Sequence, residues 1–122
     1  MLVLILAGIG FLAFGLWLLI DPAGGLSKVG IAGTTATGRI ELRAFYGGME
    51  IGLGAFLIAC AMRPEWQVAG LWLVLLANGG TALARLIGIG LAGAFSPFLA
   101  GALVWELGFS ALAALALRQS PP

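Results

Sequence analysis

The chain has 122 residues, of which 61% are hydrophobic and 9% are charged, and its formal net charge is +1. Soluble domains carry about 25% charged residues, so this chain lacks the polar side chains that would cover a water-soluble globule. The small net charge argues against a nucleic-acid partner. The absence of histidine from the sequence removes the commonest general base and the commonest metal ligand.

Four long apolar segments follow one another along the chain. Asp21-Pro22 ends the first segment, because proline cannot continue a helix. Arg63-Pro64 separates the second segment from the third, and Pro97 fits the first turn of the fourth. About 20 apolar residues cross a bilayer core of about 30 Å, so the length allows four spans with short connections. The expected helices cover about 2–20, 39–62, 65–91 and 97–117.

These helices predict an all-α fold, an integral membrane four-helix bundle that forms a single transmembrane domain over residues 1–122. An even number of spans places both termini on one membrane face, which we call side A. The long connection after the first helix and the 92–96 link then lie on the opposite face, side B. Lysine and arginine are balanced between the faces, so the positive-inside rule gives no orientation.

Small residues form a stripe on the second helix. Gly48, Gly52, Ala55 and Ala59 follow one another at the spacing that lets membrane helices approach closely. We expect this stripe to pack against another helix of the same chain, with a dimer interface as the alternative. Gly47, on the opposite face, is also expected to serve helix packing.

Four ionisable residues interrupt the apolar helices: Arg43, Glu50, Arg85 and Glu106. Ionisable side chains within a membrane usually face the bundle interior and pair with one another. Helical spacing and depth place all four in the side B half, where two acids and two bases make a neutral set. The predicted ligand-binding site or buried polar network consists of Arg43, Tyr46, Glu50, Asn78, Arg85 and Glu106.

Two interpretations of this network stay open. Arg43–Glu50 and Arg85–Glu106 are interhelical ion pairs that fix the order of the helices, or the set forms a polar pocket that opens toward side B. In such a pocket an arginine would hold an anionic or polar head group, while a carboxylate would handle a proton. A metal site is disfavoured because the arginines compete for the carboxylates. We expect no catalytic residue, no metal and no cofactor.

Three motifs carry a resemblance to a known family: Arg43-Ala-Phe-Tyr-Gly-Gly48 with Glu50, Ala84-Arg85-Leu-Ile-Gly88, and the late Glu106. The chain resembles, over about residues 5–117, a family of uncharacterised small bacterial four-helix membrane proteins. More loosely it is similar to DoxX-like membrane proteins, some of which are subunits of larger redox systems. The resemblance implies a bacterial cytoplasmic (inner) membrane location and brings no assigned reaction. The residues that match the family pattern are Arg43, Tyr46, Gly47, Gly48, Arg85 and Glu106.

The expected function is that of a small membrane protein without assigned activity. It would bind membrane lipid or a small polar ligand, or act as an accessory subunit of a larger membrane complex or as a homo-oligomer. The alternative is a proton-coupled small-solute transporter or channel that uses Glu50 and Glu106. An enzyme is not expected, because the sequence offers no recognisable nucleophile. Small multidrug exporters and fluoride channels are excluded, since their essential residues lie in a first helix that here has no ionisable side chain.

Overall fold

The computed structural model describes residues 1–121, and these are almost entirely helical. Four segments are long and apolar enough to cross a membrane, which confirms the predicted all-α four-helix membrane bundle. One of them is continuous although it comprises three elements, α3, η1 and α4. The elements, in chain order, are α1 Leu2–Ile20, α2 Pro22–Ser27, α3 Ala36–Leu42, the π-helical η1 Arg43–Gly48, α4 Met49–Met62, the 3-10 turn η2 Pro64–Trp66, α5 Gln67–Ala92 and α6 Pro97–Gln119.

Local capping explains where the structure departs from the predicted boundaries. The second span begins at Ala36 rather than near Arg39, because the hydroxyl of Thr35 accepts a hydrogen bond from the amide of Gly38 at 3.0 Å. The connection before it contains the short helix α2. The Asp21 carboxylate caps this helix by accepting a hydrogen bond from the amide of Gly24 at 2.9 Å.

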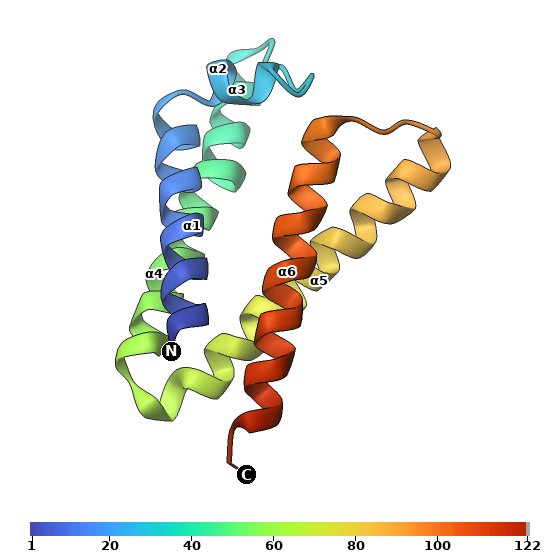
Figure 1. Cartoon of the computed structure of the whole chain (residues 1–122). Coiled ribbons are helices and arrows are strands. Elements are labelled where there is room, and N and C mark those ends of the chain that lie inside the picture. The colour runs from blue at the N-terminus through green and yellow to red at the C-terminus, as the bar shows by residue number, and fades with distance from the viewer. Residues whose placement is uncertain (122) are drawn as a thin grey trace.

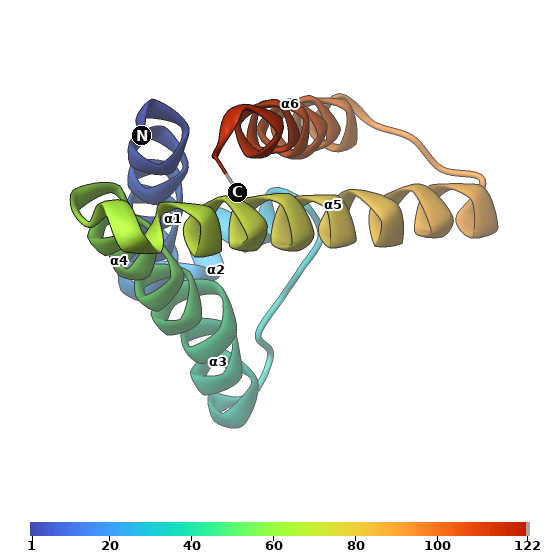
Figure 2. The same cartoon turned by 90° about the horizontal axis from the view of Figure 1, so that it is seen from below.

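The spans are arranged as two helical hairpins. In the first, α1 packs antiparallel against η1 and α4, and in the second, α5 packs against α6 (Figure 1). The hairpins meet near the chain termini and separate toward the opposite end, where α2 and α3 lie (Figure 1). Figure 2 shows the same division from below, with α5 and α6 running alongside each other and away from the α1–α4 pair.

Glycines on both helices of the first hairpin let their backbones come close. A Cβ atom on Gly15 would lie 2.9 Å from the carbonyl oxygen of Gly47. Two turns away, a Cβ atom on Gly54 would lie 2.8 Å from the carbonyl oxygen of Gly8. Real Cβ atoms do not approach backbone so closely, so these four positions interlock only as glycines. This close contact joins α1 to the second span along most of its length.

The predicted small stripe does not make such a contact. A Cβ atom on Gly52 would meet nothing within 4 Å, and one on Gly48 would meet only the carbonyl oxygen of Arg43 in its own helix, at 3.9 Å. The second span has small residues on two opposite faces. The face with Gly47 and Gly54 packs on α1, because α1 carries matching glycines, and the Gly48–Gly52 face is left outward.

The apolar core lies at side A, the end that holds the N-terminus and the end of α6. All four spans contribute to it, and Cys60 is one of its fully buried members. No comparable cluster of buried residues joins the hairpins at side B in the part of the chain that the structure describes. The core residues are Leu4, Ala7, Leu57, Cys60, Ala61, Leu71, Val74 and Ala113.

Alanine substitutions at the two glycine faces test this packing. We expect Gly54→Ala to lower the free energy of unfolding by about 1–3 kcal/mol, because its Cβ would press on α1. Gly52→Ala faces open space, so its higher helix propensity should stabilise the protein by up to about 1 kcal/mol. Thermal unfolding in detergent, followed by circular dichroism, measures both. Equal effects of the two variants would contradict the packing.

Candidate functional site in the side B half

Arg85 and Glu106 form an ion pair that links the two helices of the second hairpin. The Nη2 atom of Arg85 lies 2.6 Å from Oε1 of Glu106, and its Nε atom lies 3.2 and 3.1 Å from the two carboxylate oxygens. The side chains are 25% and 9% exposed. Because α5 and α6 are antiparallel, a residue in the second half of α5 meets one in the first half of α6. The charges compensate each other in a low-dielectric setting.

Polar side chains continue along this α5–α6 seam toward the core. The side-chain amide of Asn78 is buried and donates to the carbonyl oxygen of Val74 at 3.0 Å. Ser110 lies one turn beyond Glu106, and its buried hydroxyl has no hydrogen-bond partner within residues 1–121. A Cβ atom on Gly79 would lie 3.6 Å from that hydroxyl. Ser110 was not among the predicted site residues, although its spacing from Glu106 places both on one helix face.

Arg43 has a different partner from the one predicted. Its Nε atom donates a hydrogen bond of 3.1 Å to the carbonyl oxygen of Leu19. The last carbonyl groups of a helix have no partner within it and carry partial negative charge, so they attract a cation. The Arg43–Glu50 ion pair, one of the two alternatives that the sequence left open, is not formed, and Arg43 has no ion pair with any residue that the structure describes.

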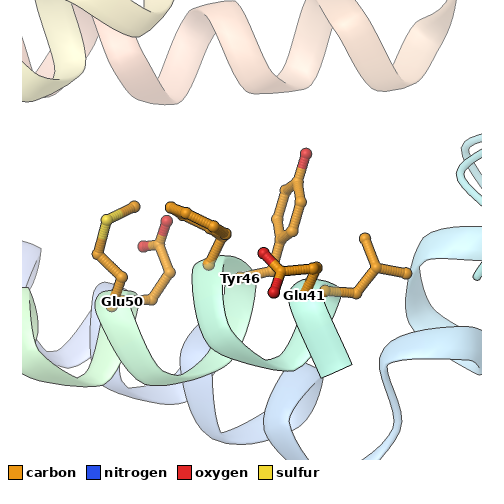
Figure 3. Close-up of a pocket in the computed structure, with 6 residues that line it drawn as sticks. Glu41, Tyr46 and Glu50 are labelled. Atoms are coloured by element: carbon orange, nitrogen blue, oxygen red, sulfur yellow. The ribbon is translucent and has the colours of Figure 1, made fainter. Parts of the chain in front are cut away.

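The structure consequently divides the predicted network between the hairpins. Glu50 and Tyr46 lie in the first hairpin and line an open cavity of about 440 Å³. Figure 3 shows Glu41, Tyr46 and Glu50 pointing to the same side of their helix. The π-helical turn at Arg43–Gly48 sets this register, and such turns are frequent at functional sites. The apolar part of the lining comes from Leu42, Phe45 and Met49.

A second cavity, of about 570 Å³ and also open on one side, lies between segments of the two hairpins at side B. The connection between α2 and α3 contributes Lys28, Val29 and Ile31. Arg85 of α5 and the start of α6, including Phe98 and Leu99, complete the lining. This cavity therefore combines two cationic side chains with apolar walls. Neither Lys28 here nor Glu41 in the other cavity was among the predicted site residues, since both lie outside the apolar cores of the spans.

This arrangement defines an integral membrane protein of four helical spans with an ion pair and two cavities in its side B half. A family model described as a domain of unknown function (DUF4345) matches residues 1–117, and the chain belongs to that family. The predicted resemblance to an uncharacterised family is thus confirmed, while the looser similarity to DoxX-like proteins stays a prediction. No curated protein and no solved structure matches the chain.

Removing one member of the ion pair tests its contribution to stability. Glu106→Ala leaves the Arg85 guanidinium uncompensated, and we expect a loss of about 3–5 kcal/mol in the free energy of unfolding. The double substitution Arg85→Met with Glu106→Leu should recover most of that loss, because it removes both charges. Denaturation in detergent measures these variants, with the exposed Glu41→Gln as the control. A double variant that is less stable than Glu106→Ala alone would contradict a direct pair.

Proposed function

We propose that this membrane protein binds an amphiphilic, lipid-like molecule in the side B half, where the two hairpins separate. The observation that carries the proposal is the 570 Å³ cavity, which joins Lys28 and Arg85 to apolar residues of both hairpins. An amphiphile has the same two parts, a polar head and an apolar body, so each would meet matching groups. The bacterial cytoplasmic membrane implied by the resemblance is the expected setting.

The distribution of packing supports this proposal. The hairpins share an apolar core only toward side A in the described residues, so side B lacks the contacts that would close the bundle. A bound molecule would supply contacts there to Val29 and Ile31 on one side and to Phe98 and Leu99 on the other. The Arg85–Glu106 pair would hold the guanidinium at the edge of the site, which restricts the movement of a long side chain.

Filling the cavity tests the proposal. The protein purified in mild detergent should retain an amphiphile that native mass spectrometry detects. Val29→Trp places an indole in the cavity and should weaken binding by at least about tenfold. Val68→Trp introduces the same side chain at a position that is 43% exposed and outside the cavity, so binding should be unchanged. Protein that neither retains nor rebinds a lipid, or an equal loss in both variants, would overturn the proposal.

Proton-coupled transport is a second candidate, and the acidic cavity is the observation that favours it. Glu50 and Glu41 line that cavity beside Tyr46, and neither glutamate has an ion-pair partner among residues 1–121. An unpaired carboxylate within a membrane span is a typical proton carrier. Glu106 is a weaker candidate than Glu50, because it would have to break its ion pair with Arg85 to take up a proton.

The decay of a pH gradient across proteoliposomes tests this second candidate. If Glu50 carries protons, an imposed pH gradient should decay faster across proteoliposomes than across empty liposomes, and Glu50→Gln should restore the slower rate. Glu65→Gln, in the η2 turn at side A, is the matched control and should behave as the unaltered protein. A pH-sensitive dye trapped inside the vesicles reports the decay. Equal rates for Glu50→Gln and the unaltered protein would exclude proton conduction through Glu50.

A further inference from the structure

We infer that the amphiphile bound in the cavity between Lys28 and Arg85 is anionic, and that these two residues hold the phosphate of an anionic phospholipid. The inference rests on the proposed function and adds the chemical class of the ligand.

The charge of the cavity is positive. Glu106 compensates Arg85, but Lys28 forms no ion pair with any acidic residue that the structure describes. The carboxylates of Glu41 and Glu50 line the other cavity, in the first hairpin. No acidic side chain lies among the described residues that line the cavity with Lys28. The pair of cations and the single carboxylate thus leave one positive charge, which an anion would neutralise.

Hydrogen-bond donors remain free on the cations. The ion pair engages Nε and Nη2 of Arg85, while Nη1 donates to no protein atom within residues 1–121. The ammonium group of Lys28 likewise has no hydrogen-bond partner in the described chain and offers three donors. Phosphate oxygens accept several charge-assisted hydrogen bonds at once, and arginine and lysine are the side chains that commonly provide them.

The N-terminal end of α6 adds to the positive electrostatic potential of the cavity. The cavity is lined by Ser96, which caps this 23-residue helix, and by Pro97, its first residue, and the N-terminal end of the helix carries partial positive charge. The Ser96 hydroxyl caps this helix by accepting a hydrogen bond from the amide of Leu99 at 3.3 Å, and its own O–H group can still donate to an anion. The helix end strengthens a site that the two cations define.

The membrane position favours a phospholipid over free phosphate. Lys28 lies outside the spans, in the side B connection, whereas Arg85 lies about 10 Å inside the end of α5. Free phosphate would lose its hydration beside Val29, Ile31, Phe98 and Leu99 without gaining apolar contacts. A phospholipid brings acyl chains that those side chains can contact. A zwitterionic lipid fits less well, because its ammonium group would find no carboxylate in the described lining.

Native mass spectrometry of the full chain can compare phosphatidylglycerol with phosphatidylcholine of the same acyl chains. We expect tighter binding of phosphatidylglycerol. Lys28→Gln should reduce that preference by about fivefold, since one lysine near an anionic surface contributes a factor of this size. Lys28→Arg should retain the preference. Arg39→Gln, an exposed side B position outside the cavity, removes the same charge and should leave the preference unchanged.

The outcomes separate this inference from the proposed function. Equal, saturable binding of both lipids would overturn the anionic assignment and leave the proposed amphiphile binding intact. Absence of saturable binding by either lipid would overturn both. Equal losses in Lys28→Gln and Arg39→Gln would show a general surface charge effect and overturn the site. Displacement of bound phosphatidylglycerol by inorganic phosphate would overturn the lipid as the source of the phosphate.

Discussion

The ion pair between Arg85 and Glu106 is the interaction on which the side B half depends. Removing either residue alone would leave an uncompensated charge on the other, which is costly in a low-dielectric setting, and the two side chains avoid this cost by lying within hydrogen-bond distance. The pair joins α5 to α6 and fixes one edge of the guanidinium. It also leaves the remaining edge at the border of a cavity that the first hairpin helps to line.

The fold follows from features that are local in the sequence. Apolar length predicts the four spans, and the prolines at positions 22, 64 and 97 mark where helices end or begin. The contact between Arg85 and Glu106 also follows from simple geometry, because both residues lie at similar depths on adjacent antiparallel helices. These predictions need only the helical rise and the high cost of an isolated charge in lipid.

The rest of the site depends on choices between alternatives that one sequence does not resolve. Arg43 has a carbonyl group at the end of α1 as its partner rather than Glu50, and this depends on how α1 and the π-helical turn meet. The second span has two small faces, and only the glycines of α1 determine that the Gly47 face is the packed one. Lys28 lies in a connection without periodicity, so its approach to Arg85 is visible only in three dimensions.

The buried position of Cys60 has a practical consequence. It is the single cysteine of the sequence, and its side chain is fully shielded in the core that joins the two hairpins. A membrane-permeant thiol reagent can reach it only when that core opens. The rate of alkylation of Cys60 therefore measures how often the two hairpins separate. The measurement needs no engineered label. Comparing alkylation rates with and without a ligand in the side B cavity would relate binding there to the separation of the hairpins at side A.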